Sequence, residues 1–269
     1  MTFKQLLKNS LFHFDELKKS KNASLWKLVL FLLLFSLIMA LPLSVQVVKV
    51  FQSIQKDSEK IAQQVPDFTV ENGTLQTDDS EGFIYQTDSI IFTFDPEGKR
   101  TAKDVSEDML GNLFSVGLLK DELVVSLPTN EITTAVMGDT QLTFPYTQGQ
   151  LKNLSGSNLR NVLTNTQLSW WMYLVILFVA FYPTFLNLLI TLLTTALIAN
   201  IYSHFKRLTY RFFDNFKIII ACSAWPTIVS AIISTFFFNF DGFTFIIIST
   251  FFLYTVAVKN SEKITPPQK

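Results

Sequence analysis

Hydrophobic residues gather in four long blocks, one near the N-terminus and three near the C-terminus. The blocks cover residues 26–48, 168–201, 218–238 and 243–258. A helix needs about 20 apolar residues to cross a bilayer, so blocks of this length with almost no charge predict transmembrane helices. The last block is the shortest and would cross where the bilayer thins locally; a helix resting on the membrane is the alternative interpretation.

The second block, residues 168–201, is too long for one straight span and too short for two. Pro183 lies in its middle and can kink or turn a helix. The segment that follows, residues 202–217, is basic, and short basic segments remain in the cytoplasm. Two spans would place this segment outside, so we predict one span that is kinked near Pro183. The charged side chains of the segment are Lys206, Arg207, Arg211, Asp214 and Lys217.

Net charge separates the ends of the chain from the stretch between the first two blocks. Residues 49–167 carry 9 basic and 17 acidic side chains, a net charge of −8, whereas residues 1–25 and the tail, residues 259–269, are basic. We therefore predict a cell-membrane protein with both termini in the cytoplasm and residues 49–167 outside it. The single cysteine, Cys222, lies in the third block, so no disulfide links the outer region, as is typical of a bacterial surface protein.

Between the first two blocks the apolar period changes from that of helices to that of strands. Residues 49–65 continue the first helix as a stalk, residues 149–167 form a second helical stalk, and a further helix is predicted over residues 105–119. Asn72 and Gly73 accept positive φ and predict a hairpin turn. The outer region is thus predicted to be a small α+β domain held by helical stalks. Strands are predicted at residues 68–70, 74–76, 83–85, 89–94, 123–127 and 141–144.

The N-terminal segment, residues 1–25, is predicted to form a cytoplasmic amphipathic helix. Within residues 2–17, apolar side chains recur at spacings of three and four, and lysines occupy the opposite face. Such a helix lies in the membrane interface or packs on the cytoplasmic ends of the spans, and the pattern is compatible with both. Nucleic-acid binding is not expected, because the lysines offset only a short stretch beside the membrane.

Side chains suited to catalysis or metal binding are scarce. The two histidines, His13 and His204, do not belong to a motif with metal-ligand spacing. The acidic runs at residues 78–81 and 95–97 are compatible with a calcium site or a carboxylate pair of a glycosidase, but solvation of loops explains them more simply. We therefore predict no catalytic, cofactor-binding or metal-binding residue, no cofactor, and a protein that is not an enzyme.

The polar residues within the predicted spans are uncharged, whereas pumps and ion-coupled carriers usually keep ionisable groups in the membrane. In the third span small residues recur every four positions, which favours close helix packing over a substrate path. The predicted fold is an α+β membrane protein, with a four-helix transmembrane bundle and a small extracytoplasmic α+β domain inserted between spans one and two. The polar residues of span two are Asn187, Thr191, Thr194, Thr195 and Asn200. The small residues of span three are Ser223, Thr227, Ala231 and Thr235.

The stretch Pro66–Leu75 reads PDFTVENGTL and resembles the "P-x-F-x-(I/V)-x-(N/D)-G-x-L" motif of a family of bacterial multi-pass membrane proteins of unknown function. Ser89–Gly98 is similar to that family's apolar strand ending in Asp-Pro-x-Gly, and Leu208–Pro226 resembles its cytoplasmic loop and following span. Some members are named maltodextrin (maltodextrose) utilisation protein MalA. The resemblance implies a link to that process and implies no mechanism and no site residue.

Two functions are compatible with this organisation. The first is a non-enzymatic accessory or sensory protein of a Gram-positive cell membrane, possessing an extracytoplasmic domain and linked to maltodextrin utilisation. Its expected partners are the lipid bilayer and another membrane or transport protein, and no nucleic acid. The alternative is a membrane subunit of a transporter for a small solute, with a path through spans two to four lined by Asn187 and the threonines.

Overall fold

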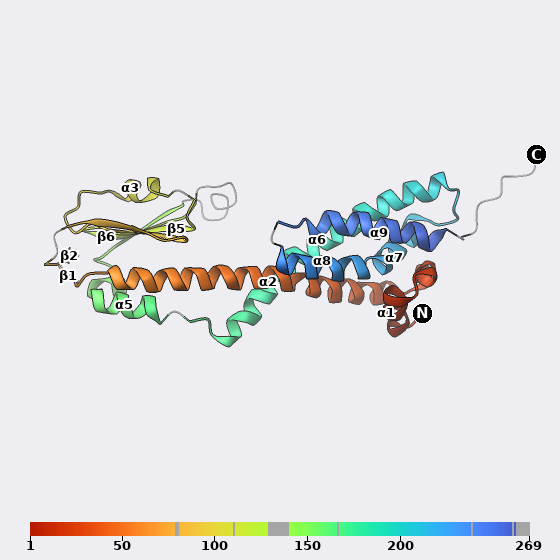
Figure 1. The fold of residues 1–269 in the computed structure, drawn as a ribbon, viewed down its shortest axis with the longest axis horizontal. Helices are drawn as coiled ribbons and strands as arrows, with labels where there is room; N and C mark the ends of the chain where they lie inside the picture. The colour runs from red at the N-terminus through yellow and green to blue at the C-terminus, as the bar shows by residue number, and fades with distance from the viewer. Residues whose placement is uncertain are drawn as a thin grey trace, which may run out of the picture. The chain divides into compact units, whose positions relative to one another are not determined.

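The computed structural model describes residues 1–78, 81–109, 111–128, 140–165, 167–237, 239–259 and 261. The chain divides into two compact units. The helical unit comprises Met1–Val48 and Ser169–Lys269, and the sheet unit comprises Lys49–Leu168. All of the described strands belong to the sheet unit (Figure 1), so the predicted mixed α+β character is confirmed.

A short hairpin opens the sheet unit. Strands β1 (Thr69–Glu71) and β2 (Thr74–Gln76) pair antiparallel, as predicted. The two turn residues have positive φ, 53° at Asn72 and 80° at Gly73, which Asn and Gly adopt at less cost than other residues.

Five further strands form one sheet in the order β3-β4-β5-β6-β7. Neighbouring strands are antiparallel except β4 and β5, which are parallel with Ile90 opposite Phe114. Helix α3 (Ala102–Glu107) makes the crossover that this parallel pair requires. The strands are β3 (Phe83–Gln86), β4 (Ile90–Phe94), β5 (Phe114–Leu118), β6 (Glu122–Ser126) and β7 (Gln141–Pro145).

The predicted helix over residues 105–119 is wrong in its second half. Helix α3 ends at Glu107, Gly111 has a positive φ of 85°, and the chain then forms β5. Burial of β5 between β4 and β6 overrides the helical pattern of this segment. The predicted helix over residues 149–167 is likewise divided, into the 3-10 helix η2 (Gly149–Asn153) and α5 (Gly156–Thr164).

Helices cover both faces of the sheet (Figure 1), with α3 on one face and α5 and the C-terminal part of α2 (Leu25–Gln64) on the other. Every residue of β4 is buried, as expected for a strand covered on both sides. On the α2 face, Ile61 of α2 belongs to the same buried cluster as Phe92 and Phe94. On the α3 face, Val105 packs in a smaller cluster with Val124.

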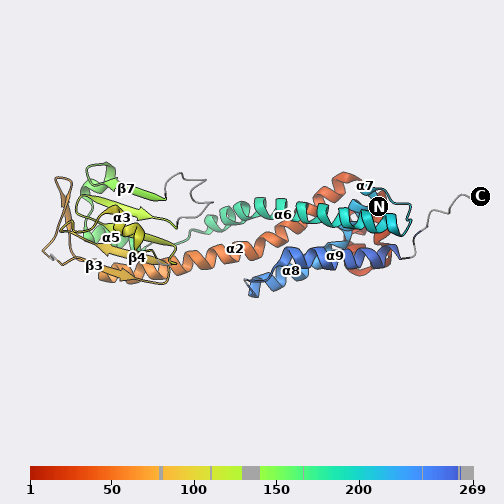
Figure 2. The same ribbon diagram turned by 90° about the horizontal axis from the view of Figure 1, so that it is seen from above.

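The helical unit contains two helices that are long and apolar enough to cross a membrane, α2 and α6 (Trp170–Phe205), among the residues that the structure describes. A third candidate is the pair α7 (Phe212–Cys222) and α8 (Ala224–Phe236), which is bent by 45°. Helix α9 (Gly242–Val258) is apolar but has only 17 residues. Figure 2 shows α8 and α9 side by side, in agreement with their contacts.

Helix α6 is continuous through Pro183, so the predicted single helix in this block is confirmed. The third block differs from its prediction as one helix over residues 218–238. Its helix begins at Phe212 and breaks at Ser223. Pro226 lacks the N–H that would bond the Cys222 carbonyl, and this loss explains the bend. The predicted loop at residues 202–217 is consequently a short turn between α6 and α7.

The N-terminal segment also differs from the single helix predicted for residues 1–25. Helix α1 (Phe3–Phe12) ends before His13, and a 3-10 helix, η1 (Phe14–Asn22), follows. Leu6 of α1 and Leu17 of η1 are fully buried in the core of the helical unit. Both segments therefore pack on the helices of that unit.

Candidate functional site

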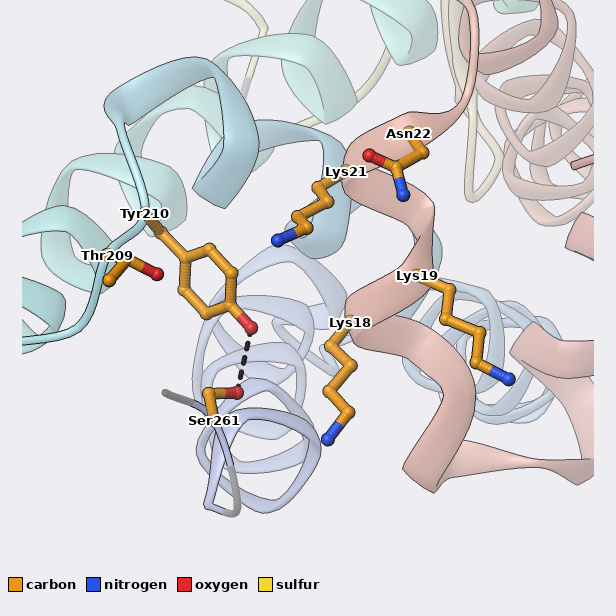
Figure 3. Close-up of a pocket in the computed structure, with 7 residues that line it drawn as sticks. All are labelled: Lys18, Lys19, Lys21, Asn22, Thr209, Tyr210 and Ser261. Carbon is orange, nitrogen blue, oxygen red and sulfur yellow. Dashed lines mark hydrogen bonds between the residues drawn. The ribbon is translucent and has the colours of Figure 1, made fainter. Parts of the chain in front are cut away.

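A basic pocket in the helical unit has three lysines among its described lining residues (Figure 3). It has a volume of about 300 Å³ and is formed by three chain segments: η1, the turn between α6 and α7, and the residue Ser261 beyond α9. Its described lining residues are Lys18, Lys19, Lys21, Asn22, Thr209, Tyr210 and Ser261.

The 3-10 geometry of η1 determines which lysines enter the pocket. With three residues per turn, side chains at i and i+3 share a face. Leu17 and Ser20 are buried and form the inner face, so Lys18 and Lys21 share a second face. Figure 3 shows both of these lysines on the side of Tyr210 and Ser261.

Lys19 lies on the third face of η1, where its ammonium is 2.6 Å from a carboxylate oxygen of Glu16. In Figure 3 the Lys19 side chain points away from Tyr210. The pocket is therefore dominated by Lys18 and Lys21, with Lys19 at its edge.

The opposite wall is built by a tight turn at the end of α6. Arg207 has a positive φ of 53°, and the Leu208 N–H donates to the Ser203 carbonyl at 2.9 Å, a common helix-ending arrangement. This reversal directs Tyr210 toward η1. The Lys21 ammonium lies 5.1 Å from the centre of the Tyr210 ring, and the Tyr210 hydroxyl donates to Ser261 Oγ at 2.7 Å.

Helix α7 fixes η1 in place. The Lys217 ammonium donates to the carbonyls of Lys21 at 3.2 Å and Ala23 at 3.0 Å. A cation at the carbonyl end of a helix is favourable, because it compensates carbonyl groups that have no partner within the helix. This contact joins residues almost 200 positions apart, so the pocket depends on the tertiary structure.

A second cavity of about 330 Å³ lies within the helical unit, between α2, α6 and the turn from α8 to α9. Two helix prolines, Pro42 and Pro183, line it together with Asn187. The Gln46 amide at its wall donates to the Ser234 carbonyl at 3.4 Å. Asn187 is thus the one residue of the predicted transport path that the structure places among the described lining of this cavity.

This cavity lacks the other predicted polar residues of the second span among its described lining residues, namely Thr191, Thr194, Thr195 and Asn200. The Thr195 hydroxyl donates to the Thr191 carbonyl of its own helix at 2.7 Å. The Asn200 side chain accepts from the Asn215 amide at 3.2 Å, and Asn215 in turn accepts from the Tyr254 hydroxyl at 2.6 Å. This buried polar cluster joins α6, α7 and α9, and sequence periodicity did not reveal it because each helix contributes one residue.

The small residues predicted for helix packing are buried, as expected, at Ser223, Thr227 and Ala231. Where α9 begins, the Ser230 hydroxyl donates to the Gly242 carbonyl at 3.1 Å, and a side chain at position 242 would collide with that hydroxyl. Glycine therefore permits the close approach of α8 and α9.

In the sheet unit the acidic runs have structural roles where they are described. The buried Asp95 carboxylate accepts the Arg100 backbone N–H at 2.7 Å, and Glu97 pairs with Lys99. Asp79 and Ser80, within the run at residues 78–81, lie outside the described residues. Among the described residues, no group of three or more His, Cys, Asp or Glu side chains is arranged to hold a metal ion.

A small apolar cavity of about 80 Å³ lies between the sheet and its helices, lined in part by Ile61, Phe92 and Leu163. Its size is below that usual for ligand pockets. Tyr146 is fully buried in the core of this unit, so its ring cannot stack on a sugar ring.

The fold is that of a mixed α+β protein, and its described residues include two helices, or up to three if the bent pair is one span, that are long and apolar enough to cross a membrane. Residues 3–258 match the family described as "protein of unknown function (DUF1189)", and the chain belongs to that family. The comparison with curated proteins and the comparison with solved structures found no match.

Proposed function

We propose that this protein is an integral membrane accessory or sensory protein and not an enzyme. In this proposal the helical unit is a bundle of four spans formed by α2, α6, the α7–α8 pair and α9, both termini are cytoplasmic, and the sheet unit is extracytoplasmic. The observation that carries the proposal is the continuity of α2. One uninterrupted helix supplies Phe31 and Phe35 to the core of the helical unit and Ile61 to the core of the sheet unit.

We propose that α2, which contributes residues to both units, couples their two cores thermodynamically. A partner or ligand that binds the sheet unit more tightly in one packing arrangement of α2 shifts the population toward that arrangement. The last turns of α2 are attached to the sheet by apolar contacts of Ile61 and by the buried carboxylate of Asp57, which accepts the Ser89 N–H at 2.8 Å. A sensory role in which the sheet unit signals through α2 requires a connection of this kind.

The partner is proposed to be another membrane or transport protein. Crosslinking in native membranes followed by mass spectrometry tests this directly, with crosslinks from lysines of the sheet unit such as Lys99 and Lys103, which are well exposed. Reproducible crosslinks from these lysines to one membrane protein support the proposal. The proposal is contradicted if crosslinks form only within the chain. The control is a known membrane complex that is captured at the same expression level.

The proposed physiological link is maltodextrin utilisation, and it rests on the family resemblance of Pro66–Leu75 and the two other motifs. A deletion strain is expected to grow more slowly on maltodextrins than on glucose, or to express its maltodextrin genes differently. Unchanged growth and unchanged expression would remove the link to this sugar while leaving the accessory role to the crosslinking experiment.

The cavity at Pro42, Pro183 and Asn187 favours a second candidate, a subunit of a transporter for a small solute. Proline in a membrane helix leaves a carbonyl without its usual partner, and such carbonyls can line a solute site. Uptake by liposomes that contain the purified protein separates the candidates. Uptake by the wild type that is reduced by Asn187→Leu supports transport, and absence of uptake supports the accessory role.

A further inference from the structure

We propose that the cavity between α2, α6 and the α8–α9 turn binds a small organic ligand that carries a protonated amine. The cavity has a volume of about 330 Å³, and its described lining residues include the carboxylate of Asp241 and no lysine, arginine or histidine. Binding here does not require transport, so the inference goes beyond the second candidate function. It rests on the proposed function in one respect, namely that the α8–α9 turn faces the outside of the cell.

The polar groups of the lining mainly offer hydrogen-bond acceptors. The Gln46 amide nitrogen donates to the Ser234 carbonyl at 3.4 Å, which leaves the Gln46 amide oxygen as an acceptor. The Thr184 hydroxyl donates its one hydrogen to the Ala180 carbonyl at 2.8 Å, so its oxygen can only accept from a further group. An ionised carboxylate such as that of Asp241 also only accepts. A ligand that fits this lining therefore brings N–H donors.

Asp241 supplies a negative charge at this site. It is the N-cap of α9, where its Oδ1 accepts the Thr244 N–H at 3.1 Å. Hydrogen bonds from Thr244 lower the pKa of Asp241 below its ordinary value of 3.8, so the exposed carboxylate is ionised at pH 7. Among the described residues, no lysine or arginine contributes to this lowering. The basic side chains outside the described residues, Lys263 and Lys269, follow the opposite end of α9 in the sequence.

The apolar part of the lining indicates an organic ligand and not a bare metal ion. Phe240 and Phe243 offer aromatic rings, which attract ammonium groups, and Met39 and Leu43 offer contacts for carbon substituents. A metal ion needs a compact shell of oxygens at about 2.0–2.6 Å. A volume of about 330 Å³ instead falls at the lower end of the range of organic ligand sites, about 300–1,000 Å³.

The walls of the cavity are held in place by contacts between the helices. The Ser230 hydroxyl of α8 donates to the Gly242 carbonyl at 3.1 Å and so fixes the turn that carries Asp241. The bond from Gln46 to the Ser234 carbonyl joins α2 to α8. Binding therefore requires little ordering of the protein, which reduces the entropic cost of association.

The test measures the binding of n-butylammonium to the full-length protein in dodecyl maltoside at pH 7, by ligand-observed NMR. Asp241→Asn removes the charge and keeps a residue that caps helices equally well, and it is expected to weaken binding about tenfold. Gln46→Met removes an acceptor at similar size and is expected to weaken binding about threefold or more. The wild type is expected to bind n-butylammonium about tenfold more tightly than 1-butanol, which carries a hydroxyl in place of the ammonium.

The matched control is Glu59→Gln, which removes the same charge from an exposed position of α2 that is not among the described lining residues of the cavity. It is expected to change the affinity by less than twofold. Equal weakening in Asp241→Asn and Glu59→Gln would show non-specific attraction and overturn the site. Equal affinity of the wild type for n-butylammonium and 1-butanol would overturn it without reliance on any variant. Displacement of n-butylammonium by an equal concentration of sodium would overturn the organic ligand.

A second arm distinguishes a free amine from the amine headgroup of a phospholipid. Wild type and Asp241→Asn are placed in nanodiscs of phosphatidylethanolamine and phosphatidylglycerol, and the retained lipid is measured by native mass spectrometry. Selective retention of phosphatidylethanolamine by the wild type only identifies the headgroup as the source. Equal retention of both lipids, together with charge-dependent binding of n-butylammonium in detergent, identifies a free amine.

Binding in detergent does not depend on how the chain is oriented in a membrane, so this inference and the proposed function fail separately. Failure of the wild type to bind n-butylammonium, and to retain phosphatidylethanolamine selectively, overturns the amine site and leaves the proposed function to the crosslinking experiment. Asn239 is exposed on the α8–α9 turn. If Asn239→Cys is protected from a membrane-impermeant maleimide in intact cells while n-butylammonium still binds in detergent, the proposed topology is contradicted and the amine site is supported.

Discussion

The Asp57 carboxylate on α2 accepts the Ser89 backbone N–H at the start of β4 at 2.8 Å, and this contact ties α2 to the sheet. Burial of this carboxyl works to raise its pKa, but hydrogen bonds from Lys60 and Ser89 outweigh burial and hold the pKa below its ordinary value of 3.8. A depressed pKa means that the ionised form stabilises the folded state. This stabilisation is present above pH 3.8 and is lost as the pH falls through the lower folded-state pKa.

Asp57→Asn is therefore expected to destabilise the sheet unit by about 1–2 kcal/mol at pH 7, since a hydrogen bond to a charged acceptor becomes a neutral one. Hydrogen–deuterium exchange of the full-length chain should show about 5- to 30-fold faster exchange in β4. The difference should persist at pH 5 and shrink near pH 3. Glu59→Gln, a matched charge loss at an exposed position of the same helix, should have no such effect. Unchanged protection of β4 in Asp57→Asn would contradict the attachment.

Gly117 of β5 lies directly beneath Val105 of α3, and a Cβ at position 117 would come within 2.7 Å of Val105 Cγ2. Gly117→Ala is expected to destabilise the sheet unit by about 1–3 kcal/mol through overpacking. Val105→Ala removes both colliding methyl groups, and alone it costs about 2 kcal/mol because it leaves a cavity. In the double variant the cavity receives the new methyl group, so the combined loss should be smaller than the sum by about 1 kcal/mol or more. Strictly additive losses, measured by exchange of β5 amides, would mean that α3 does not pack here.

The Tyr146 hydroxyl is buried, and the described residues provide it with no hydrogen-bond partner. Burial, with smaller contributions from Glu122 and Asp121, raises the pKa of this side chain, so the hydroxyl is neutral at physiological pH. Removing an unsatisfied buried hydroxyl removes its desolvation cost, and Tyr146→Phe should stabilise the sheet unit by about 1 kcal/mol. Urea titration followed by amide exchange in β6 and β7 measures this change. A loss of stability, beyond that of the control Tyr85→Phe, would indicate that the hydroxyl has a partner.

Local signals predicted much of this fold, and tertiary interactions account for the errors. The β1–β2 hairpin was predicted because Asn72 and Gly73 specify a turn within four residues. Strand β5 was not predicted. Pairing with β4 and β6 imposes the extended conformation on residues 114–118, and this pairing cannot be read from the segment alone. The bend between α7 and α8 follows from Pro226, and the break occurs three residues earlier, at Ser223, because the lost hydrogen bond involves the Cys222 carbonyl.

The basic pocket, too, could be predicted from the sequence only in its local features. The positive charge of the N-terminal segment and of the α6–α7 turn was visible in the sequence. The sequence could not predict that these segments form one pocket. The pocket depends on the 3-10 geometry of η1 and on the hydrogen bond from Lys217 to the Lys21 carbonyl, and these two residues are far apart in the chain.

Labelling of single cysteines by a membrane-impermeant maleimide in intact Gram-positive cells tests most directly whether the sheet unit is extracytoplasmic and the N-terminus cytoplasmic. The chain has one native cysteine, Cys222, which is buried and gives a low background. Lys99→Cys introduces a thiol on the surface of the sheet unit, and Lys4→Cys introduces one on the exposed face of α1. With the proposed topology, Lys99→Cys is labelled in intact cells and Lys4→Cys only after the membrane is permeabilised. Labelling of Lys4→Cys in intact cells, or protection of Lys99→Cys until permeabilisation, would contradict it.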